Sequence, residues 1–325
     1  MVQISSKALS NVGVQASLGA FLKEQGMDPL ENEPLRNHCT WRIGGPADFL
    51  VEPSSWEQVA LVLQYSSENG IPAVVIGKGS NLLFDDRGLR GVVIKIGRKL
   101  SRLAIAGTIV QAQGGISAPR LARAVGLAGL SGLEHIVGIP GTLGGLVFMN
   151  GGSLRRAIGD TIVEVRTMDR QGNTQTLGRQ ECRFAYRHSR FQEESCIIME
   201  ATMALARGRR DAIAAEMLEI LRERRRKFPM TLPNCGSVFT NDPQVCASLG
   251  PPGKIIESAG LKGAFVGDAV VSERHANFIV NRANAKAEDV LSLIELVRER
   301  VIRQTGETLE CEVRFVESTG VIRAP

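Results

Sequence analysis

The most constraining feature of this sequence is a run of glycines in its middle, GLSGLEHIVGIPGTLGGLVFMNGGS at residues 129–153. Glycine permits positive φ angles and lets the backbone come close to another group, at an entropic cost inside a regular element. The apolar stretches 136–137 and 146–149 interrupt the glycines and predict a buried segment. A buried, glycine-rich backbone with free N–H groups suits a phosphate or a flat polar ring system. A tightly packed loop that crosses a core is the alternative.

The rest of the composition is that of a globular protein with two or three domains. Of its 325 residues, 43% are hydrophobic and 22% are charged. No apolar run approaches the roughly 20 residues that cross a bilayer, and the N-terminus lacks the pattern of a signal peptide. Six scattered cysteines form no CxxC pair, which predicts reduced thiols and a cytoplasmic protein. The four histidines show no metal-binding spacing, so we expect no metal.

The formal net charge of +5 suits anionic small molecules. The densest basic cluster, residues 222–227, lacks interleaved aromatic residues and ends a predicted helix, where cations interact favourably with the helix dipole. We therefore expect no nucleic-acid binding and no membrane insertion. The protein is expected to be a monomer or a weak oligomer.

Residues 1–207 are predicted to form a weakly structured N-terminal extension, 1–36, and a mixed α+β domain, 37–207. In the extension, a short helix is expected around 18–25. Ser54 and Glu57 predict a capping box for a helix that ends near Asn69. Ser117 is expected to cap a second helix, with Pro119 in its first turn. Strands are predicted at 49–51, 73–76, 91–96, 108–112, 162–168, 174–177 and 196–205, the hairpin turn being DRQGN.

The loop GKGSNLL at 77–83 joins two of these strands. Glycines at the end of a strand, beside Ser80 and Asn81, expose consecutive N–H groups and short polar donors, which together make a pyrophosphate cradle. A plain β-turn is the alternative. The motifs GxxxxGK[ST] and GxGxxG are absent, which disfavours a P-loop kinase and a Rossmann cofactor domain.

A composition shift around 207–211 predicts a second, smaller α/β domain at 208–325. Apolar residues at helical spacing predict helices at 211–227 and 287–304, the second one stopped at Gly306. Strands are expected at 276–280 and 311–316, and the second of these is expected to close the domain.

Three polar residues have patterns compatible with catalysis. Ser237 follows a glycine, but no GxSxG elbow surrounds it, so a hydrolase nucleophile is disfavoured. Glu312 lies in an apolar strand, where half-burial would raise the pKa of its carboxyl; a solvated strand face is equally compatible with the pattern. Arg187 offers a planar fork of donors for a carboxylate, although on pattern alone it reads as a surface arginine.

Several longer segments resemble one enzyme family. The glycine-rich run GLEHIVGIPGTLGGLVFMNGG is similar to the flavin-binding signature of the MurB family, the UDP-N-acetylenolpyruvoylglucosamine reductases. Together the similar segments span about residues 36 to 317, in the order of the family. The other segments are CTWRIGGPADFLVEP (39–53), VIGKGSNLLFDDRGLRGVVI (75–94), FAYRHSRF (184–191), PNCGSVFTN (233–241), GLKGAFVGDAVVSERHANFIVN (260–281) and LECEVRFV (309–316).

The resemblance implies an α+β protein. Its FAD-binding fold would be of the vanillyl-alcohol-oxidase/PCMH type, with two α+β subdomains, followed by a smaller α/β substrate-binding domain. It also implies noncovalent FAD as cofactor and NADPH as reductant. The implied FAD-binding residues are Gly77, Lys78, Gly79, Ser80, Asn81, Leu82, Gly138, Ile139, Pro140, Gly141, Thr142, Gly144, Gly145, Asn150 and Gly151.

The resemblance further implies the reduction of UDP-N-acetylglucosamine enolpyruvate to UDP-N-acetylmuramate, in peptidoglycan precursor synthesis. NADPH first reduces FAD, and the UDP-sugar then enters the same site. Flavin N5 delivers hydride to C3 of the enolpyruvyl group, Arg187 and Glu312 stabilise the resulting aci-enolate, and Ser237 protonates C2. The implied substrate-binding residues are Tyr186, Arg187, Lys227, Gly236 and Asn241.

Two departures from the family pattern matter. The four residues 192–195 between YRHSRF and the next strand are too few for the insertion of one subgroup, so the chain resembles the shorter, second type. His135 stands where an aromatic residue is common, which raises a histidyl–flavin link as an alternative to noncovalent FAD. Two other functions stay open: another FAD oxidoreductase of this fold that acts on an alcohol or lactone, and a nucleotide-binding regulatory module without catalysis.

Overall fold

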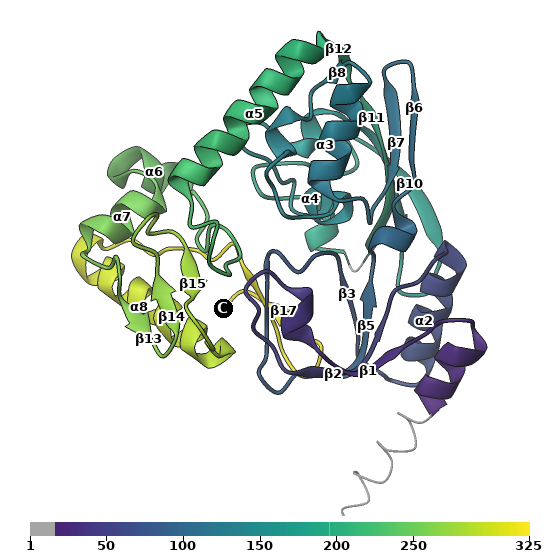
Figure 1. The fold of residues 1–325 in the computed structure, drawn as a ribbon. Coiled ribbons are helices and arrows are strands. Elements are labelled where there is room, and N and C mark those ends of the chain that lie inside the picture. Colours follow the sequence, from purple (N-terminus) through teal and green to yellow (C-terminus); the bar gives the residue numbers. More distant parts are fainter. Residues whose placement is uncertain (1–16, 195) are drawn as a thin grey trace, which may run out of the picture.

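The computed structural model describes residues 17–194 and 196–325. Two β-sheets with their helices occupy one side of the molecule, and a smaller domain containing α6, α7 and α8 lies beside them (Figure 1). Within the described residues, no helix is long and apolar enough to span a membrane.

The first sheet has the strand order β1-β2-β5-β3. Strand β2 is antiparallel to β1 and parallel to β5, and β3 is also parallel to β5. Its elements are β1 (Leu30–Pro34), η1 (Leu35–His38), β2 (Pro46–Val51), α2 (Trp56–Glu68), β3 (Ala73–Ile76) and β5 (Leu89–Lys95).

The cap of α2 differs by one residue from the expected capping box. Ser55 is the N-cap, and its hydroxyl accepts a hydrogen bond from the N–H of Gln58 at 3.2 Å. The Gln58 amide in turn accepts from the backbone and the hydroxyl of Ser54. The reciprocal bonds therefore involve a glutamine at the third helical position, not Glu57.

Much of the expected weakly structured extension is folded. Residues 17–24 are helical, and Leu18 and Leu22 are fully buried against Phe49 and Val59. The segment Leu30–Pro34 is an edge strand. Its sequence, LENEP, gave no strand pattern because most side chains of this edge strand are exposed. The first part of the extension, residues 1–16, lies outside the described residues.

The second sheet has the order β10-β9-β11-β7-β6 and is antiparallel throughout. Strands β9 and β10 form the expected hairpin. Ser117 is the N-cap residue of α3, but its side chain makes no capping hydrogen bond. The elements of this subdomain are η2 (Arg98–Leu100), β6 (Leu103–Ala106), β7 (Ile109–Gln113), α3 (Ala118–Leu127), β8 (Leu130–Ser131), η3 (Glu134–Ile136), α4 (Leu143–Phe148), η4 (Ile158–Asp160), β9 (Ile162–Met168), β10 (Thr174–Gly178), η5 (Arg190–Gln192), β11 (Ile197–Ala204) and β12 (Ala206–Arg207).

Helix α5 (Arg210–Lys227) packs on this second subdomain, whereas the sequence placed it in the smaller domain. Its buried residues Ile213, Met217 and Ile220 belong to the same core as α3 and β8. The elements that share the core of the second subdomain therefore extend to Lys227, the end of α5, and do not stop at residue 207. An apolar helix face does not reveal which neighbour it covers, so the composition shift at 207–211 was misleading.

The smaller domain consists of a three-stranded antiparallel sheet and three helices. Helix α8 ends with Gly306 in the left-handed conformation, as expected. The elements are α6 (Pro243–Leu249), α7 (Pro252–Ser258), β13 (Phe265–Val266), β14 (Ala269–Val271), β15 (Ile279–Asn281) and α8 (Ala287–Thr305).

The strand expected at 311–316 is β16 (Arg314–Val316), and it does not close the smaller domain as expected. It pairs in parallel with β4 (Leu82–Phe84) and antiparallel with β17 (Ile322–Arg323). This long-range pairing brings the C-terminal strand to the end of the GKGSN loop.

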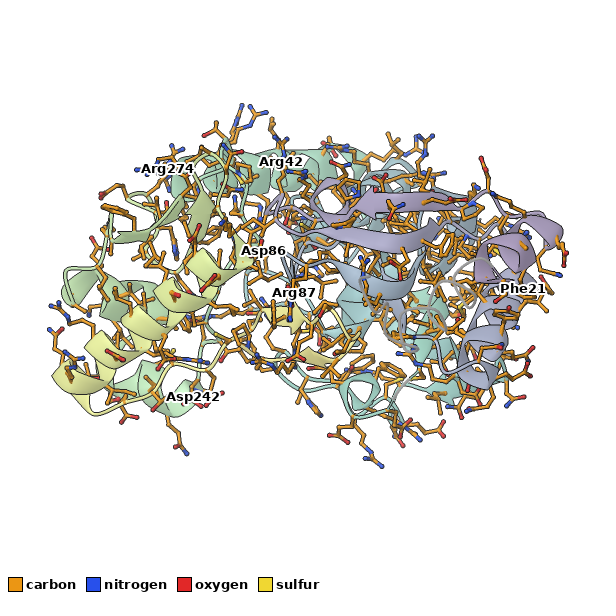
Figure 2. The ribbon with its side chains drawn as sticks, turned by 90° about the horizontal axis from the view of Figure 1, so that it is seen from below. Phe21, Arg42, Asp86, Arg87, Asp242 and Arg274 are labelled. Atoms are coloured by element: carbon orange, nitrogen blue, oxygen red, sulfur yellow. The ribbon has the colours of Figure 1, made fainter. Side chains whose placement is uncertain are left out.

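Side-chain contacts also join the smaller domain to the first sheet. The Trp41 indole donates to the Ile279 carbonyl at 2.7 Å, and the Asp86 carboxylate accepts from the N–H of Ala287 at 2.9 Å, at the start of α8. Asp86 lies beside α8 at the junction of the two parts (Figure 2). Hydrogen bonds between segments that are distant in the sequence thus hold the smaller domain against the first sheet.

Candidate functional site

A cavity of about 1100 Å³ lies where the two subdomains and the smaller domain meet. Its walls include the GKGSN loop, the 139–153 segment, the YRHS loop and the segment 228–237. The predicted residues that line it are Gly77, Lys78, Gly79, Ser80, Asn81, Leu82, Ile139, Pro140, Gly141, Thr142, Gly144, Gly145, Gly151, Arg187, Gly236, Ser237 and Glu312.

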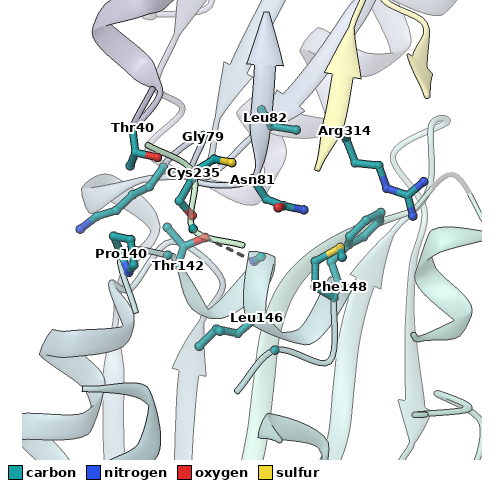
Figure 3. A pocket seen from close by; sticks show the side chains of 18 of the residues that line it. Thr40, Gly79, Asn81, Leu82, Pro140, Thr142, Leu146, Phe148, Cys235 and Arg314 are labelled. Atoms are coloured by element: carbon teal, nitrogen blue, oxygen red, sulfur yellow. Dashed lines mark hydrogen bonds between the residues drawn. The ribbon is translucent and has the colours of Figure 1, made fainter. Parts of the chain in front are cut away.

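The two glycine-rich segments face each other in this cavity (Figure 3). A Cβ atom at Gly77 would lie 2.4 Å from the Thr142 hydroxyl, so no side chain fits there. Thr142 also caps α4 by accepting a hydrogen bond from the N–H of Gly145 at 3.3 Å. Gly77 therefore allows a close approach of its backbone to the Thr142 side chain, the kind of contact that the glycines suggested.

The GKGSN loop offers donors to the cavity and is hydrogen-bonded to the segment that carries Glu312 and Arg314. Among the described residues, none accepts a hydrogen bond from the N–H groups of Gly79 and Ser80. The side-chain amide of Asn81 donates to the Glu312 carbonyl at 2.9 Å, and the Asn81 carbonyl accepts from the N–H of Arg314 at 3.0 Å. Asn81 thus uses an amide proton to fix the position of Glu312, a role that its motif did not reveal.

Ser237 and Glu312 come from two directly bonded segments. The N–H of Glu312 donates to the carbonyl of Val238 at 2.8 Å, and Phe239 forms a bridge with Cys311. Within the described residues, the half-buried Ser237 hydroxyl has no hydrogen-bond partner. It is therefore available to a ligand in the cavity.

Arg187 and Glu312 form an ion pair inside the cavity. Arg187 Nε lies 2.9 Å from Glu312 Oε1, and the two side chains are 24% and 17% exposed. The Nε–H bond does not point at the carboxylate, so the contact is an ion pair without an aligned hydrogen bond. Burial raises the pKa of Glu312, and the positive charge of Arg187 opposes that rise. The direction agrees with the expectation from the sequence.

The backbone of Arg187 has a φ of 52°, a strained conformation for a residue other than glycine. Hydrogen bonds from neighbouring polar side chains hold this loop. The amide of Gln192 donates to the Arg187 carbonyl at 2.9 Å, and its oxygen accepts from Arg314 at 2.8 Å. The amide of Asn150 donates to the Ala185 carbonyl at 2.7 Å, and the Ser189 hydroxyl donates to the Phe148 carbonyl at 2.6 Å.

Two residues predicted to bind FAD do not line the cavity. Asn150 is buried and accepts from the N–H of Gly159 at 3.0 Å while bracing the YRHS loop. A Cβ at Gly138 would lie 2.3 Å from Arg224 Cδ, so this glycine makes room for Arg224, which does line the cavity. Both residues contact neighbours of the cavity lining, and their role in FAD binding remains a prediction.

Three predicted substrate-binding residues also lie outside the cavity lining. The amide of Asn241 donates to the hydroxyl of Tyr186 at 3.0 Å, which links the YRHS loop to the smaller domain. Tyr186 is 53% exposed. Lys227 lies 3.5 Å from Glu223 on the same helix. A substrate-binding role for these three residues remains a prediction.

His135 is buried away from the cavity lining. Neither ring nitrogen has a hydrogen-bond partner in the described part of the chain. Burial is the main cause that lowers the pKa of His135 to about 4. This position does not favour a histidyl–flavin link.

Several cavity arginines were missed by sequence reasoning. Arg314 follows Glu312 by two residues in an extended segment, so period-2 alternation could have found it. It points across the cavity toward Phe148 (Figure 3). Arg42, Arg170 and Arg224 also line the cavity. They belong to segments noted in the sequence (39–53, the DRQGN turn and 222–227), but nothing in those patterns assigned them to a binding site.

The lining fits a flavin dinucleotide. The GKGSN loop leaves the N–H groups of Gly79 and Ser80 without a partner in the described residues, and arginines and Lys78 supply positive charge. Arg224 Nε is also buried without a partner in this part of the chain. The cavity volume is at the upper end of the range for small-molecule sites, which suits a large cofactor with a substrate beside it. In the described residues, no cluster of histidine, cysteine or acidic side chains could hold a metal ion.

Family models match both parts of the chain. Residues 47–178 match an FAD-binding domain, and residues 228–316 match the C-terminal domain of UDP-N-acetylenolpyruvoylglucosamine reductase. The second match begins directly after α5, in agreement with the packing of that helix on the FAD-binding part.

Relatives and a solved structure agree with these matches. UDP-N-acetylenolpyruvoylglucosamine reductase 1 of Corynebacterium glutamicum is 44% identical over 89% of this chain and 86% of its own length. The reductase of Heliobacterium modesticaldum is 44% identical over 90% of this chain and 91% of its own.

The crystal structure of the enzyme MurB from Thermus caldophilus has a TM-score of 0.74 and 30% identity, covering 89% of this chain and 98% of that one. The fold is therefore the expected FAD-binding fold of the vanillyl-alcohol-oxidase/PCMH type followed by a substrate-binding domain. From its motifs, its cavity and these relatives, the chain belongs to the MurB family of UDP-N-acetylenolpyruvoylglucosamine reductases.

Proposed function

We propose that this protein uses FAD and NADPH to reduce UDP-N-acetylglucosamine enolpyruvate to UDP-N-acetylmuramate, a cytoplasmic step of peptidoglycan precursor synthesis. One observation carries the proposal. Ser237, Arg187 and Glu312 line the same cavity as the two glycine-rich loops. Curated relatives that match most of this chain bear the name of this reductase.

The polar groups of the cavity suit the enolpyruvyl carboxylate and the UDP group. The guanidinium of Arg187 is a planar donor for the carboxylate, and Arg314 adds a second positive charge near Glu312. We assign further substrate contacts to Gly236 in the cavity and to the Tyr186–Asn241 pair beside it.

Lys227 is assigned to the phosphates because it ends α5 immediately before the lining segment 228–237. Its present partner, Glu223, is 33% exposed, so exchanging that ion pair for a phosphate has a small cost.

Bound FAD, once reduced by NADPH, supplies the hydride. The residues of the chain then manage charge and protons on the substrate. Negative charge develops on the substrate carboxylate, where Arg187 donates hydrogen bonds. Burial raises the pKa of Glu312. A protonated carboxyl there would donate a hydrogen bond to an enolate oxygen and keep its proton when C2 is protonated. Preorganised donors of this kind are each worth about 10²–10³ in rate.

Ser237 is proposed to give the proton that completes the product. Its hydroxyl lines the cavity and makes no hydrogen bond to the described part of the protein. The proton of Ser237 Oγ passes to C2 of the enolate, and solvent restores it afterwards. The backbone hydrogen bond from the N–H of Glu312 to the Val238 carbonyl keeps the segments that carry Glu312 and Ser237 together.

A single-turnover experiment tests the function. The FAD-loaded protein is reduced without oxygen by one equivalent of NADPH, and the UDP-linked enolpyruvate is then added. Reoxidation of the flavin with one equivalent of UDP-N-acetylmuramate is the expected result. A reduced protein that ignores this substrate but is reoxidised rapidly by air would instead be an oxidase, and a protein that binds no flavin would be a regulatory module.

A further inference from the structure

Arg170 lines the cavity from an unexpected direction. It lies in the turn between β9 and β10, at the tip of a hairpin that belongs to the second subdomain. Two hydrogen bonds fix this tip to the first subdomain. Arg170 Nη1 donates to the Ala73 carbonyl at 2.8 Å, and the Gln64 amide donates to the Gln171 carbonyl at 2.7 Å. The guanidinium is therefore held at a defined place.

That place is at the far end of the cavity from the catalytic groups. Ala73 is the first residue of β3, and the GKGSN loop follows the last one, Ile76. At about 3.3 Å per residue, these two ends of the strand are roughly 10 Å apart. Glu312 lies beyond the loop, bonded to Asn81. The order along the cavity is thus Arg170, the glycine loop, and then Glu312.

The surroundings of Arg170 leave its charge without a protein partner. Within the described residues, no carboxylate forms an ion pair with it, and burial lowers the pKa of its guanidinium. Two apolar residues of the cavity lining lie near it: Val75 is two residues from Ala73 on β3, and Ile197 pairs with Met168, two residues before Arg170. By contrast, Arg166 on strand β9 pairs with Glu200 at 3.3 Å and stacks on Trp56.

We propose that Arg170 binds the adenylate half of FAD, with its guanidinium against the adenine ring and Val75 and Ile197 forming the slot for that ring. This assignment rests on the FAD site of the proposed function. With the reacting ring system beside Ser237 and the pyrophosphate at the glycine loop, the adenosine falls at the Arg170 end. A planar cation with donors to spare suits the face and edge of a purine.

The test compares two flavins that differ in the adenylate group. Dissociation constants of FAD and of riboflavin 5′-phosphate are measured by flavin fluorescence for the apoprotein, Arg170→Leu and the matched control Arg166→Leu. Arg170→Leu is expected to weaken FAD binding about tenfold or more and to leave riboflavin 5′-phosphate within twofold. The control is expected to leave both flavins within twofold.

Two results would overturn the proposal. An unchanged dissociation constant for FAD would remove Arg170 from the site. Equal weakening of both flavins, with a lower melting temperature of the apoprotein, would make Arg170 a tie between β3 and the hairpin. A wild-type protein that binds FAD but forms no UDP-N-acetylmuramate would contradict the proposed function and leave the Arg170 result intact.

Discussion

The substitution Gly79→Ala tests the close approach on which the cofactor loop depends. Gly79 has a φ of +60°, and a Cβ there would lie 2.3 Å from the His38 carbonyl oxygen and 2.8 Å from Cys39 Cα. Both are backbone atoms, so the loop or the segment 38–40 must move. The left-handed conformation costs an alanine about 1–2 kcal/mol, and overpacking typically adds about 1–3 kcal/mol. Gly79→Ala should therefore lower the free energy of unfolding by about 2–5 kcal/mol.

Gly107→Ala is the matched control. Its φ of +63° is nearly the same, but nothing lies within 4 Å of the added Cβ. Gly107→Ala should lower the free energy of unfolding by about 1–2 kcal/mol, because only the left-handed backbone conformation opposes the alanine. Urea denaturation of the apoproteins measures both values, and titration with FAD measures the cofactor affinity, which should fall in Gly79→Ala and stay constant in Gly107→Ala. Equal destabilisation by the two substitutions would refute the close-contact argument.

Three further predictions concern the surroundings of the site. The pKa of His135 is lowered from 6.5 to about 4, so the unfolded chain gains a proton first as the pH falls. The free energy of unfolding should therefore fall by about 3 kcal/mol as the pH is lowered from 6.5 to about 4. Urea titrations at several pH values should show that His135→Phe removes this loss. The same pH dependence of unfolding in the variant and the wild type would contradict the prediction. Asn150→Gly keeps the positive φ but removes one hydrogen bond to the Ala185 carbonyl in the Arg187 loop and one from the N–H of Gly159. It should slow the substrate step at least about tenfold and leave FAD affinity within twofold. Weakened FAD binding would instead support its predicted cofactor role. The pKa of Glu312 is raised, so its carboxyl should contribute to the pH dependence of the substrate step. Glu312→Gln should slow that step about 10²–10³-fold and remove this contribution, with flavin reduction by NADPH unchanged. If the rate of the variant kept the same pH dependence, that dependence would belong to another group.

Local sequence patterns predicted the elements whose cause is local. The spacing of apolar residues and Gly306 predicted α8, and the DRQGN turn predicted the β9–β10 hairpin. The glycine loops were identified because only an unusual backbone conformation or a close contact explains so many glycines. In the family context, Ser237, Arg187 and Glu312 were predicted as a group, and all three line one cavity.

The features that were missed depend on contacts between distant segments. Strand β16 pairs with β4, which lies more than two hundred residues earlier in the chain. No pattern in either strand indicates which strand it will pair with. The apolar face of α5 is compatible with packing on either domain. Arg170 resembles an ordinary turn residue until the hairpin is seen to reach Ala73.

The half-reactions of Ser237→Ala test the central claim most directly. Stopped-flow absorbance follows flavin reduction by NADPH and then flavin reoxidation by the UDP-linked enolpyruvate, with product measured by chromatography. NADPH should reduce the flavin of the variant at the wild-type rate, while the rate of UDP-N-acetylmuramate formation should fall by about 10²-fold or more. Equal slowing of both half-reactions, or full product formation without the hydroxyl, would contradict Ser237 as the proton donor in this cavity.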